Sequence, residues 1–212
     1  MIEAYLDKLE QACRAKGIDK FEIRYQCEAN AALQVYEQKV SDARDNSSES
    51  VSLVVLQDGK KGRFETADFD EAKIPLVVDE ALANARAVDT EETFFFHDGS
   101  GDYHQVMPYQ PLAELAELDK IRFLKDLERL AYEADGRINK VIKTCLAEGR
   151  RTLTIRNSLG LNLNRETNRA YAYIYLSAKE GDIVKTDSEA VCFNRPQDFD
   201  PRTMVEKAVP RL

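Results

Sequence analysis

The stretch Arg151–Gly181, RTLTIRNSLGLNLNRETNRAYAYIYLSAKEG, decides the fold. Leu153 and Ile155 alternate with polar residues, which is the period-2 pattern of a half-buried β-strand. The run Asn157-Ser-Leu-Gly160 then ends the alternation with residues that favour turns. In the return strand Ala170–Leu176, three tyrosines share one face and aliphatic residues share the other. The stretch therefore predicts two strands joined by a polar connection rich in Asn. None of its residues has the pattern of a nucleophile or a metal ligand.

Related patterns extend on both sides of this stretch, over residues 119–212. An apolar stripe with helical spacing predicts a helix at 119–135, which Gly136 ends. Pro201 is placed to begin a further helix, because the first N–H groups of a helix have no partner to lose. The strands of this half are predicted at 140–147, 151–157, 169–177 and 183–193.

Residues 1–88 show the same order of patterns. Helices are predicted at 2–16 and at 71–87, and Asp68 and Asp70 offer N-cap carboxylates to the second one. Asp58-Gly59 is a hairpin signal. The polar run 41–50 is compatible with a loop or with a weakly apolar edge strand. The other strands of this half are predicted at 21–26, 32–38, 51–56 and 63–66.

The two halves resemble each other along the sequence. Ile18-Asp-Lys-Phe21 is similar to Ile138-Asn-Lys-Val141, and the cap triplet Asp68-Phe-Asp70 recurs as Asp198-Phe-Asp200. This similarity favours an internal duplication. The alternative is that α+β proteins often reuse such patterns and that the offsets are fortuitous. Residues 89–118 carry glycines and prolines, and we expect an irregular connection there, either a linker or a functional loop.

The predicted fold class is α+β, with one continuous curved antiparallel sheet or two related sheets, and with helices packed on one face. It is built from two similar halves, each a helix, a four-strand meander and a helix. The domains are 1–88 as the first half, 89–118 as the irregular connection and 119–212 as the second half. Nothing follows the last helix to cover its apolar side, so we expect a chain truncated before a C-terminal domain.

Composition limits the function. The formal net charge of −8 argues against a nucleic-acid partner, because proteins that bind nucleic acids present a basic patch. The basic pairs Lys60-Lys61 and Arg150-Arg151 lie beside glycines and are interpreted as turn residues. No apolar run approaches the roughly 20 residues that span a bilayer, and the N-terminus lacks a signal peptide. We therefore expect a cytoplasmic protein without membrane contact.

The sequence gives little support for a metal site or for a catalytic nucleophile. His97 and His104 lie in one loop with Asp98 and Asp102, but their spacing does not place ligands on one helical face. A polar loop with aromatic residues is the favoured interpretation. A Cys–His pair has no local signature, and the four dispersed cysteines are predicted to be reduced and mostly buried thiols. They are Cys13, Cys27, Cys145 and Cys192.

Three further patterns have structural explanations. The run Asp58–Gly62 lacks the GxxxxGK[ST] pattern of a phosphate loop, and a hairpin turn explains it. The acidic residues Glu91-Glu92, Asp68 and Asp70 are interpreted as capping or solvated charges. The tyrosines of the return strand favour packing at a sheet or subunit interface over base stacking, because basic residues are missing around them. These are Tyr171, Tyr173 and Tyr175. We assign no catalytic, cofactor-binding or metal residue.

Three stretches in order resemble the TldD/PmbA family, formerly called modulators of DNA gyrase. Glu22-Ile-Arg-Tyr-Gln26 is similar to the first strand of the family. Ser52–Gly62 with Arg63–Asp70 is similar to its hairpin, glycine turn, return strand and helix start. Ile155-Arg-Asn-Ser-Leu-Gly160 is similar to its NS-x-G turn. The resemblance covers nearly the whole chain through motifs of low individual specificity. It leans toward the PmbA (TldE) branch.

The resemblance implies an N-terminal domain of a subunit of a cytoplasmic bacterial metallopeptidase complex that cuts unfolded or flexible peptides. In that family the zinc motif, His-Glu-x-x-x-His with a downstream Cys, belongs to the TldD subunit. This chain has no such motif, so zinc is expected only in a TldD-like partner and this chain is expected to be non-catalytic. The implied partners are a TldD-like subunit, or a further copy through self-association, and peptide substrates. The alternatives are a stand-alone peptide- or protein-binding module that uses a sheet edge or the tyrosine face, and an independent cysteine hydrolase.

Overall fold

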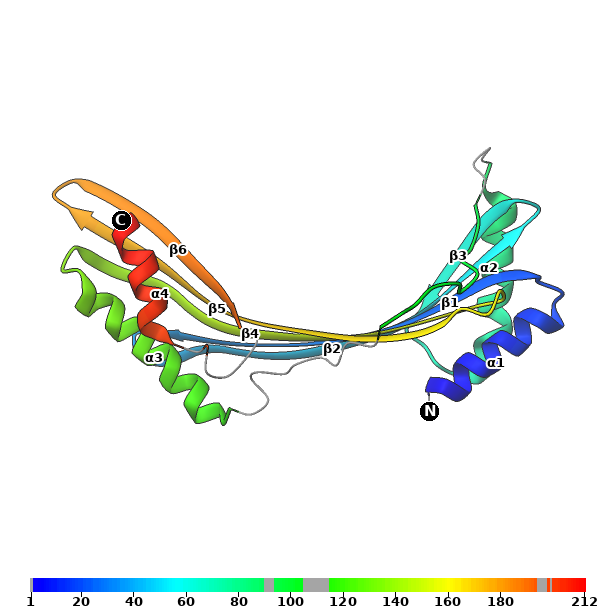
Figure 1. Ribbon diagram of the computed structural model, residues 1–212, viewed down its shortest axis with the longest axis horizontal. Helices are drawn as coiled ribbons and strands as arrows, with labels where there is room; N and C mark the ends of the chain where they lie inside the picture. Colours follow the sequence, from blue (N-terminus) through cyan, green and yellow to red (C-terminus); the bar gives the residue numbers. More distant parts are fainter. Residues whose placement is uncertain (1, 90–93, 105–114, 194–197, 199) are drawn as a thin grey trace. The chain divides into compact units, whose positions relative to one another are not determined.

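A computed structural model describes residues 2–89, 94–104, 115–193, 198 and 200–212. Six strands form one sheet in the order β3-β2-β1-β4-β5-β6, and the predicted α+β class with an antiparallel sheet is confirmed. Figure 1 labels the elements along the chain. Their bounds are α1 Ile2–Ala15, β1 Lys20–Tyr36, β2 Lys39–Gln57, β3 Lys60–Thr66, α2 Ile74–Ala87, α3 Glu117–Ala134, β4 Ile138–Asn157, β5 Asn162–Glu180, β6 Ile183–Phe193 and α4 Pro201–Ala208.

The chain forms two compact units that are not continuous in sequence. The first unit comprises Met1–Glu28, Ser48–Val106 and Arg151–Glu166. The second unit comprises Ala29–Ser47, Met107–Arg150 and Thr167–Leu212. Strands β1, β2, β4 and β5 each contribute one segment to each unit. The helices do not divide in this way, because α1 and α2 belong to the first unit and α3 and α4 to the second.

The core of the first unit lies between α1, α2 and one face of β1 and β2. Period-2 alternation places every second side chain of a strand on the same face, and the apolar stripes of the two helices pack against that face. Tyr5 of α1 contacts Phe69 edge to face, with 5.6 Å between the ring centroids. The core residues include Leu6, Leu9 and Cys13 of α1, Val78 and Ala81 of α2, Phe21 and Ile23 of β1, and Val51, Leu53 and Val55 of β2.

The core of the second unit lies under α3 and α4, which pack side by side (Figure 1). In β5 the aliphatic face is buried, whereas the tyrosine face remains partly exposed, as the alternation predicts. Phe123 of α3 meets Phe193 edge to face at 6.4 Å between centroids. The core residues include Leu124, Leu127 and Ala131 of α3, Met204 and Ala208 of α4, Leu33 and Val35 of β1, and Ala172, Ile174 and Leu176 of β5.

The predicted strand breaks are wrong. Strands predicted at 21–26 and 32–38 are one strand, β1, and those at 140–147 and 151–157 are one strand, β4. Arg150-Arg151 lies inside β4 and is not a turn, while Lys60-Lys61 begins β3 directly after its turn. Each half therefore has three long strands and not four. The physical reason is that the polar segments of these strands contribute little to either core, so their hydrophobic alternation stops although their backbone pairing continues.

The boundaries of the Asn-rich connection are also wrong. The sequence predicts this connection between a strand that ends at 157 and one that begins at 169. In the structure β5 already begins at Asn162, which leaves only a short turn after β4. The polar run 41–50 is part of β2, which fits the edge-strand alternative. The order of helix, three strands and helix occurs twice, while the duplication and the proposed domain boundaries stay predictions.

Helix ends follow the sequence signals. Asp70 accepts a hydrogen bond from the Ala72 N–H at 3.0 Å, and Asp200 accepts one from the Arg202 N–H at 3.0 Å. The predicted helix 71–87 starts as a short 3₁₀ turn, Glu71–Lys73, before α2 begins. Gly17 has a φ of 71°, which is the left-handed conformation that ends α1. Of the predicted connection 89–118, residues 94–104 are irregular, while 90–93 and 105–114 lie outside the described residues.

A buried carboxylate holds the turn between β1 and β2. Glu37 and Gln38 have φ values of 49° and 59°, which are unusual for residues with a Cβ but suit a two-residue hairpin turn. Glu128 of α3, which is 1% exposed, accepts hydrogen bonds from both backbone N–H groups at 2.7 Å. It also accepts one from Gln38 Nε2 at 2.9 Å. The helix therefore compensates the strain of a turn about 90 residues away.

Gly62 allows α2 to pack directly on β3. A Cβ atom at this position would lie 2.0 Å from the Ala81 carbonyl oxygen and 2.4 Å from the Ala85 nitrogen. Both atoms belong to helix backbone, so no side-chain rotation could relieve the overlap. Glycine is required here for close approach and not for an unusual φ.

The substitution Gly62→Ala should lower the free energy of unfolding by about 1–3 kcal/mol or more, because the added methyl group forces α2 away from the sheet. Urea unfolding followed by circular dichroism measures the change. Gly136→Ala is the matched control, since a Cβ there meets nothing within 4 Å. Equal stability of the two variants would contradict the packing described.

The substitution Glu128→Gln should weaken the β1–β2 turn by about 1–3 kcal/mol, because an amide cannot accept from all three donors and places an NH₂ group against one of them. Hydrogen exchange at the Glu37 and Gln38 amides measures the effect locally. Glu133→Gln, an exposed change on the same helix, should leave these amides unchanged. Full protection of the turn in Glu128→Gln would argue against the role of the carboxylate.

Candidate functional site

The histidine loop of the first unit forms local contacts. His97 Nδ1 accepts a hydrogen bond from the Gly99 N–H at 3.0 Å and lies 3.2 Å from the Tyr103 hydroxyl. The nearest carboxylate contacts are 3.8 Å from His97 to Asp98 and 3.7 Å from His104 to Asp102, between exposed side chains. The described residues contain no group of three or more His, Cys, Asp or Glu side chains that could hold a metal ion.

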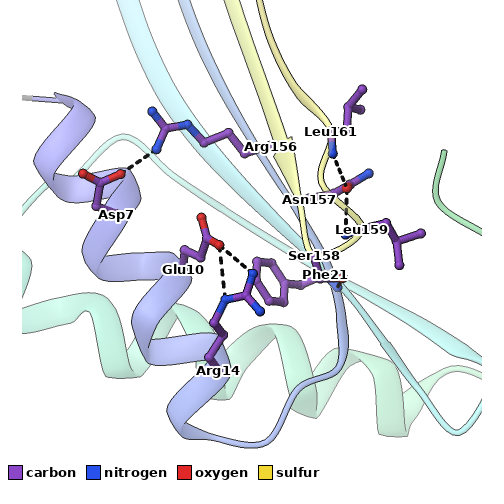
Figure 2. Close-up of polar contacts among 9 residues, drawn as sticks. All are labelled: Asp7, Glu10, Arg14, Phe21, Arg156, Asn157, Ser158, Leu159 and Leu161. Atoms are coloured by element: carbon purple, nitrogen blue, oxygen red, sulfur yellow. Dashed lines mark hydrogen bonds and ion pairs between the residues drawn. The ribbon is translucent and has the colours of Figure 1, made fainter. Parts of the chain in front are cut away.

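The Asn157 corner fixes this loop to the sheet. Figure 2 shows the contacts of Asn157 with Leu159 and Leu161. Asn157 Oδ1 accepts hydrogen bonds from the Leu159 and Leu161 N–H groups at 3.0 and 3.1 Å, and its Nδ2 donates to the His97 carbonyl at 2.7 Å. Ser158 exchanges hydrogen bonds with the backbone of Phe21, through its N–H at 2.9 Å and its Oγ at 3.1 Å. All polar groups of the Asn157 side chain are therefore engaged in structure.

Arg156 beside this corner joins β4 to the acidic face of α1. Its guanidinium contacts Glu3 and lies 2.6 Å from Asp7 Oδ1 (Figure 2). The Arg156 side chain is only 15% exposed, and its Nε has no hydrogen-bond partner among the described atoms. Nearby, Arg14 pairs with Glu10 and lies 5.5 Å over the ring of Phe21. These contacts hold a helix against the sheet and leave no free cation pointing at solvent.

Two of the four cysteines are poorly suited to act as nucleophiles. Burial raises the pKa of the Cys13 thiol to about 12, and burial also raises the pKa of the Cys145 thiol. A raised pKa removes the thiolate that attacks substrates at neutral pH. Cys27 is half-buried and Cys192 is exposed, so the prediction of mostly buried thiols holds for two of the four.

The remaining sequence candidates have structural roles. Asp58, with a φ of 52°, and Gly59 form the predicted β2–β3 turn. Asp68 accepts from the Asp70 N–H at 2.9 Å and pairs with Lys73, which lowers the pKa of the Asp68 carboxyl. Glu91-Glu92 lies outside the described residues. In the tyrosine face, Tyr171 is paired with Cys192 and Tyr173 with Ala190 across β5 and β6.

The second unit contains a groove, which we call the α3 groove. It consists of two cavities of about 330 and 230 Å³ that share Ala31, Asp45 and Glu148. Its lining mixes small residues with charged ones. The lining side chains include Leu33, Ala43, Arg44, Lys120 and Leu146 in the larger cavity, and Asn30, Gly149, Arg150, Asn168 and Arg169 in the smaller one.

Charges in the α3 groove are partly paired. Lys120 Nζ lies 3.5 Å from Glu148 Oε1, and Arg44 Nε lies 2.7 Å from Asp42 Oδ2. Amide and charged groups over small residues suit a polar chain segment better than an apolar ligand. Sequence reasoning missed this groove, because its residues come from four strands and one helix and share no local motif.

The fold and the sites together define a class of protein. It is an α+β chain whose described residues form structural networks of hydrogen bonds and ion pairs, and a polar groove. Residues 110–212, just under half of the chain, match the sequence profile of the PmbA/TldA metallopeptidase central domain. This part of the chain is therefore similar to the central domain of that metallopeptidase family. The resemblance predicted an N-terminal domain, and that placement stays a proposal.

Solved structures share the fold. A candidate modulator of a DNA gyrase from Thermotoga maritima MSB8 matches with a TM-score of 0.86 and 20% identity, over 99% of this chain and 47% of that chain. TldE from Thermococcus kodakarensis matches with a TM-score of 0.81 and 20% identity, over 96% of this chain and 46% of that chain. A candidate modulator of DNA gyrase from Bacteroides thetaiotaomicron VPI-5482 matches with a TM-score of 0.84 and 17% identity, over 99% of this chain and 48% of that chain.

These likenesses show the fold alone. This chain spans about half the length of each of the three solved structures. No curated protein sequence matches this chain. Among the described residues, no helix is both long and apolar enough to cross a membrane.

The substitution Asn157→Asp should release the histidine loop while keeping the turn. Aspartate retains an acceptor for the Leu159 and Leu161 N–H groups but places an oxygen against the His97 carbonyl, where Nδ2 donated. Hydrogen exchange should become on the order of ten-fold faster in residues 94–104. Asn162→Asp, an exposed change at the start of β5, is the control. Unchanged exchange in the loop would show that Asn157 does not hold it.

Proposed function

We propose that this chain is the N-terminal part of a PmbA/TldE-like subunit of a cytoplasmic metallopeptidase complex that acts on unfolded or flexible peptides. The chain itself is non-catalytic in this proposal. It forms part of the wall around the peptide-cleaving chamber and pairs with a TldD-like subunit, which carries the zinc.

The observation that carries this proposal is the match of residues 110–212 to the metallopeptidase central domain. The sequence supports the non-catalytic role. Its two histidines, His97 and His104, are seven positions apart and cannot form His-Glu-x-x-x-His. The likeness to TldE supports the choice of branch at the level of the fold.

The chemistry of the described residues is consistent with a supporting role. The buried thiols have raised pKa values, and the side chains around the Asn157 corner are hydrogen-bonded to backbone. The α3 groove and the strand edges present accessible polar groups. Such groups recognise a chain and do not activate water or a nucleophile.

A second candidate is a stand-alone peptide- or protein-binding module. The polar α3 groove in the second unit favours it, since binding there needs no partner subunit. The two candidates differ in one property, which is whether peptide cleavage appears when a zinc-bearing subunit is added.

We expect the purified chain alone to leave an unfolded peptide, such as a casein fragment, intact with or without EDTA. Coexpressed with a TldD-like subunit that carries His-Glu-x-x-x-His, it should copurify and the mixture should cleave the peptide in an EDTA-sensitive way. Peptide cleavage is followed by mass spectrometry. EDTA-sensitive cleavage by the chain alone would overturn the non-catalytic role, and failure to copurify would favour the stand-alone module.

A further inference from the structure

One segment of the sheet has an open edge. β2 pairs with β3 only from Val51 to Gln57. The earlier part of β2, Lys39–Ser47, belongs to the second unit and has β1 as its sheet neighbour. Within the described residues no strand pairs with its outer side. Eight of these nine residues are exposed and Asp42 is half-buried, so both faces of the segment are open as well. Such an edge is a template for pairing with another strand.

The alternation along β2 shows which backbone groups point outward. Gln57 and Lys60 flank the two-residue turn Asp58-Gly59 and exchange hydrogen bonds, so the odd-numbered residues of β2 from Val51 to Gln57 direct their N–H and C=O groups to the outer side, toward β3. Gln34 Nε2 donates to Asp42 Oδ2 at 3.1 Å, which shows that even-numbered residues of β1 and β2 share a face near Asp42, as they do beside Val51. The alternation is therefore the same in both parts of β2, and Ser41, Ala43 and Asp45 direct their backbone groups to the open side.

The charges on this edge are self-complementary. Arg44 Nε lies 2.7 Å from Asp42 Oδ2, which shows that both side chains share one face of the strand. If two copies pair antiparallel about Ala43, Ala43 faces its own equivalent and the two residues exchange backbone hydrogen bonds at the two-fold axis. Asp42 of each copy then lies opposite Arg44 of the other at non-hydrogen-bonded positions, where opposite side chains are closer.

Neighbouring registers are disfavoured by charge. A shift that centres the pairing on Asp42 sets two carboxylates opposite each other, and one centred on Arg44 opposes two guanidinium groups. Centring on Asp45 also opposes two carboxylates. Like charges directly opposite destabilise a strand pair, so the charges select the register centred on Ala43.

We propose that Lys39–Ser47 of β2 is a docking surface for a second copy of this chain, paired antiparallel with Ala43 at the two-fold axis. The pairing is isologous, as expected for a closed dimer. The contact is one strand wide, so the dimer is weak and salt-sensitive. This inference is independent of the proposed function, because it is tested on the chain alone without peptide or partner subunit.

Charge reversal tests the pairing by sedimentation equilibrium at low ionic strength. Asp42→Arg and Arg44→Asp should each weaken the dimer on the order of ten-fold, because each sets like charges opposite each other twice. The double variant, Asp42→Arg with Arg44→Asp, should dimerise like the wild type. An equimolar mixture of the two single variants should form a heterodimer. Lys185→Glu on the other edge strand, β6, is the control for altered net charge.

Cross-linking tests the register. In a Cys192→Ser background, Ala43→Cys should form a disulfide dimer under mild oxidation, because directly opposite Cα atoms at a hydrogen-bonded pair lie about 5.5 Å apart, which a disulfide can span. Ser47→Cys, which lies opposite Lys39, should not. The proposal is overturned if the chain is monomeric and Ala43→Cys cross-links no faster than Ser47→Cys. It is equally overturned if a dimer forms that the single charge reversals leave unchanged, or if their mixture fails to pair.

Discussion

Sharing of long strands between two compact units is the constraint on which the structure depends. β1, β2, β4 and β5 each contribute a segment to both units. β1 supplies apolar residues to both cores, whereas β2 supplies them to the first core and β4 and β5 supply them to the second. Period-2 alternation must therefore be correct separately at each core. Between these segments the strands continue through backbone hydrogen bonds without an apolar face. The helices have a simpler role, because each pair covers the exposed apolar face of one unit.

Several polar side chains of the described residues stabilise this arrangement of strands and helices. Glu128 neutralises the strain of a hairpin turn, Asn157 holds a loop to the sheet, and Arg156 fixes α1 through two carboxylates. These are the residue types that often form active sites, yet here they bond to backbone groups or form structural ion pairs. The match to a metallopeptidase central domain thus falls on a part of the chain whose described side chains form structure and a groove.

Long strands with polar segments also create open edges. β3 covers only the later part of β2, so the earlier part presents backbone donors and acceptors with charged side chains around them. Charges commonly protect such edges against unspecific pairing. Here Asp42 and Arg44 are arranged so that the same charges that reject wrong registers favour one register with a second copy.

The sequence by itself determined the helices, their caps and the alternation of the core strands, since these depend on neighbouring residues: Asp70 and Asp200 cap, Gly17 ends a helix, and Ala172, Ile174 and Leu176 share a face. The tertiary structure decided the continuity of β1 and β4, because pairing with neighbouring strands keeps Glu28–Asn30 and Gly149–Arg151 extended where hydrophobic alternation is absent. It also decided the contact of Glu128 with a turn about 90 residues away, the close approach of α2 to Gly62 and the α3 groove. These features join residues distant in sequence, and no local pattern carries that information.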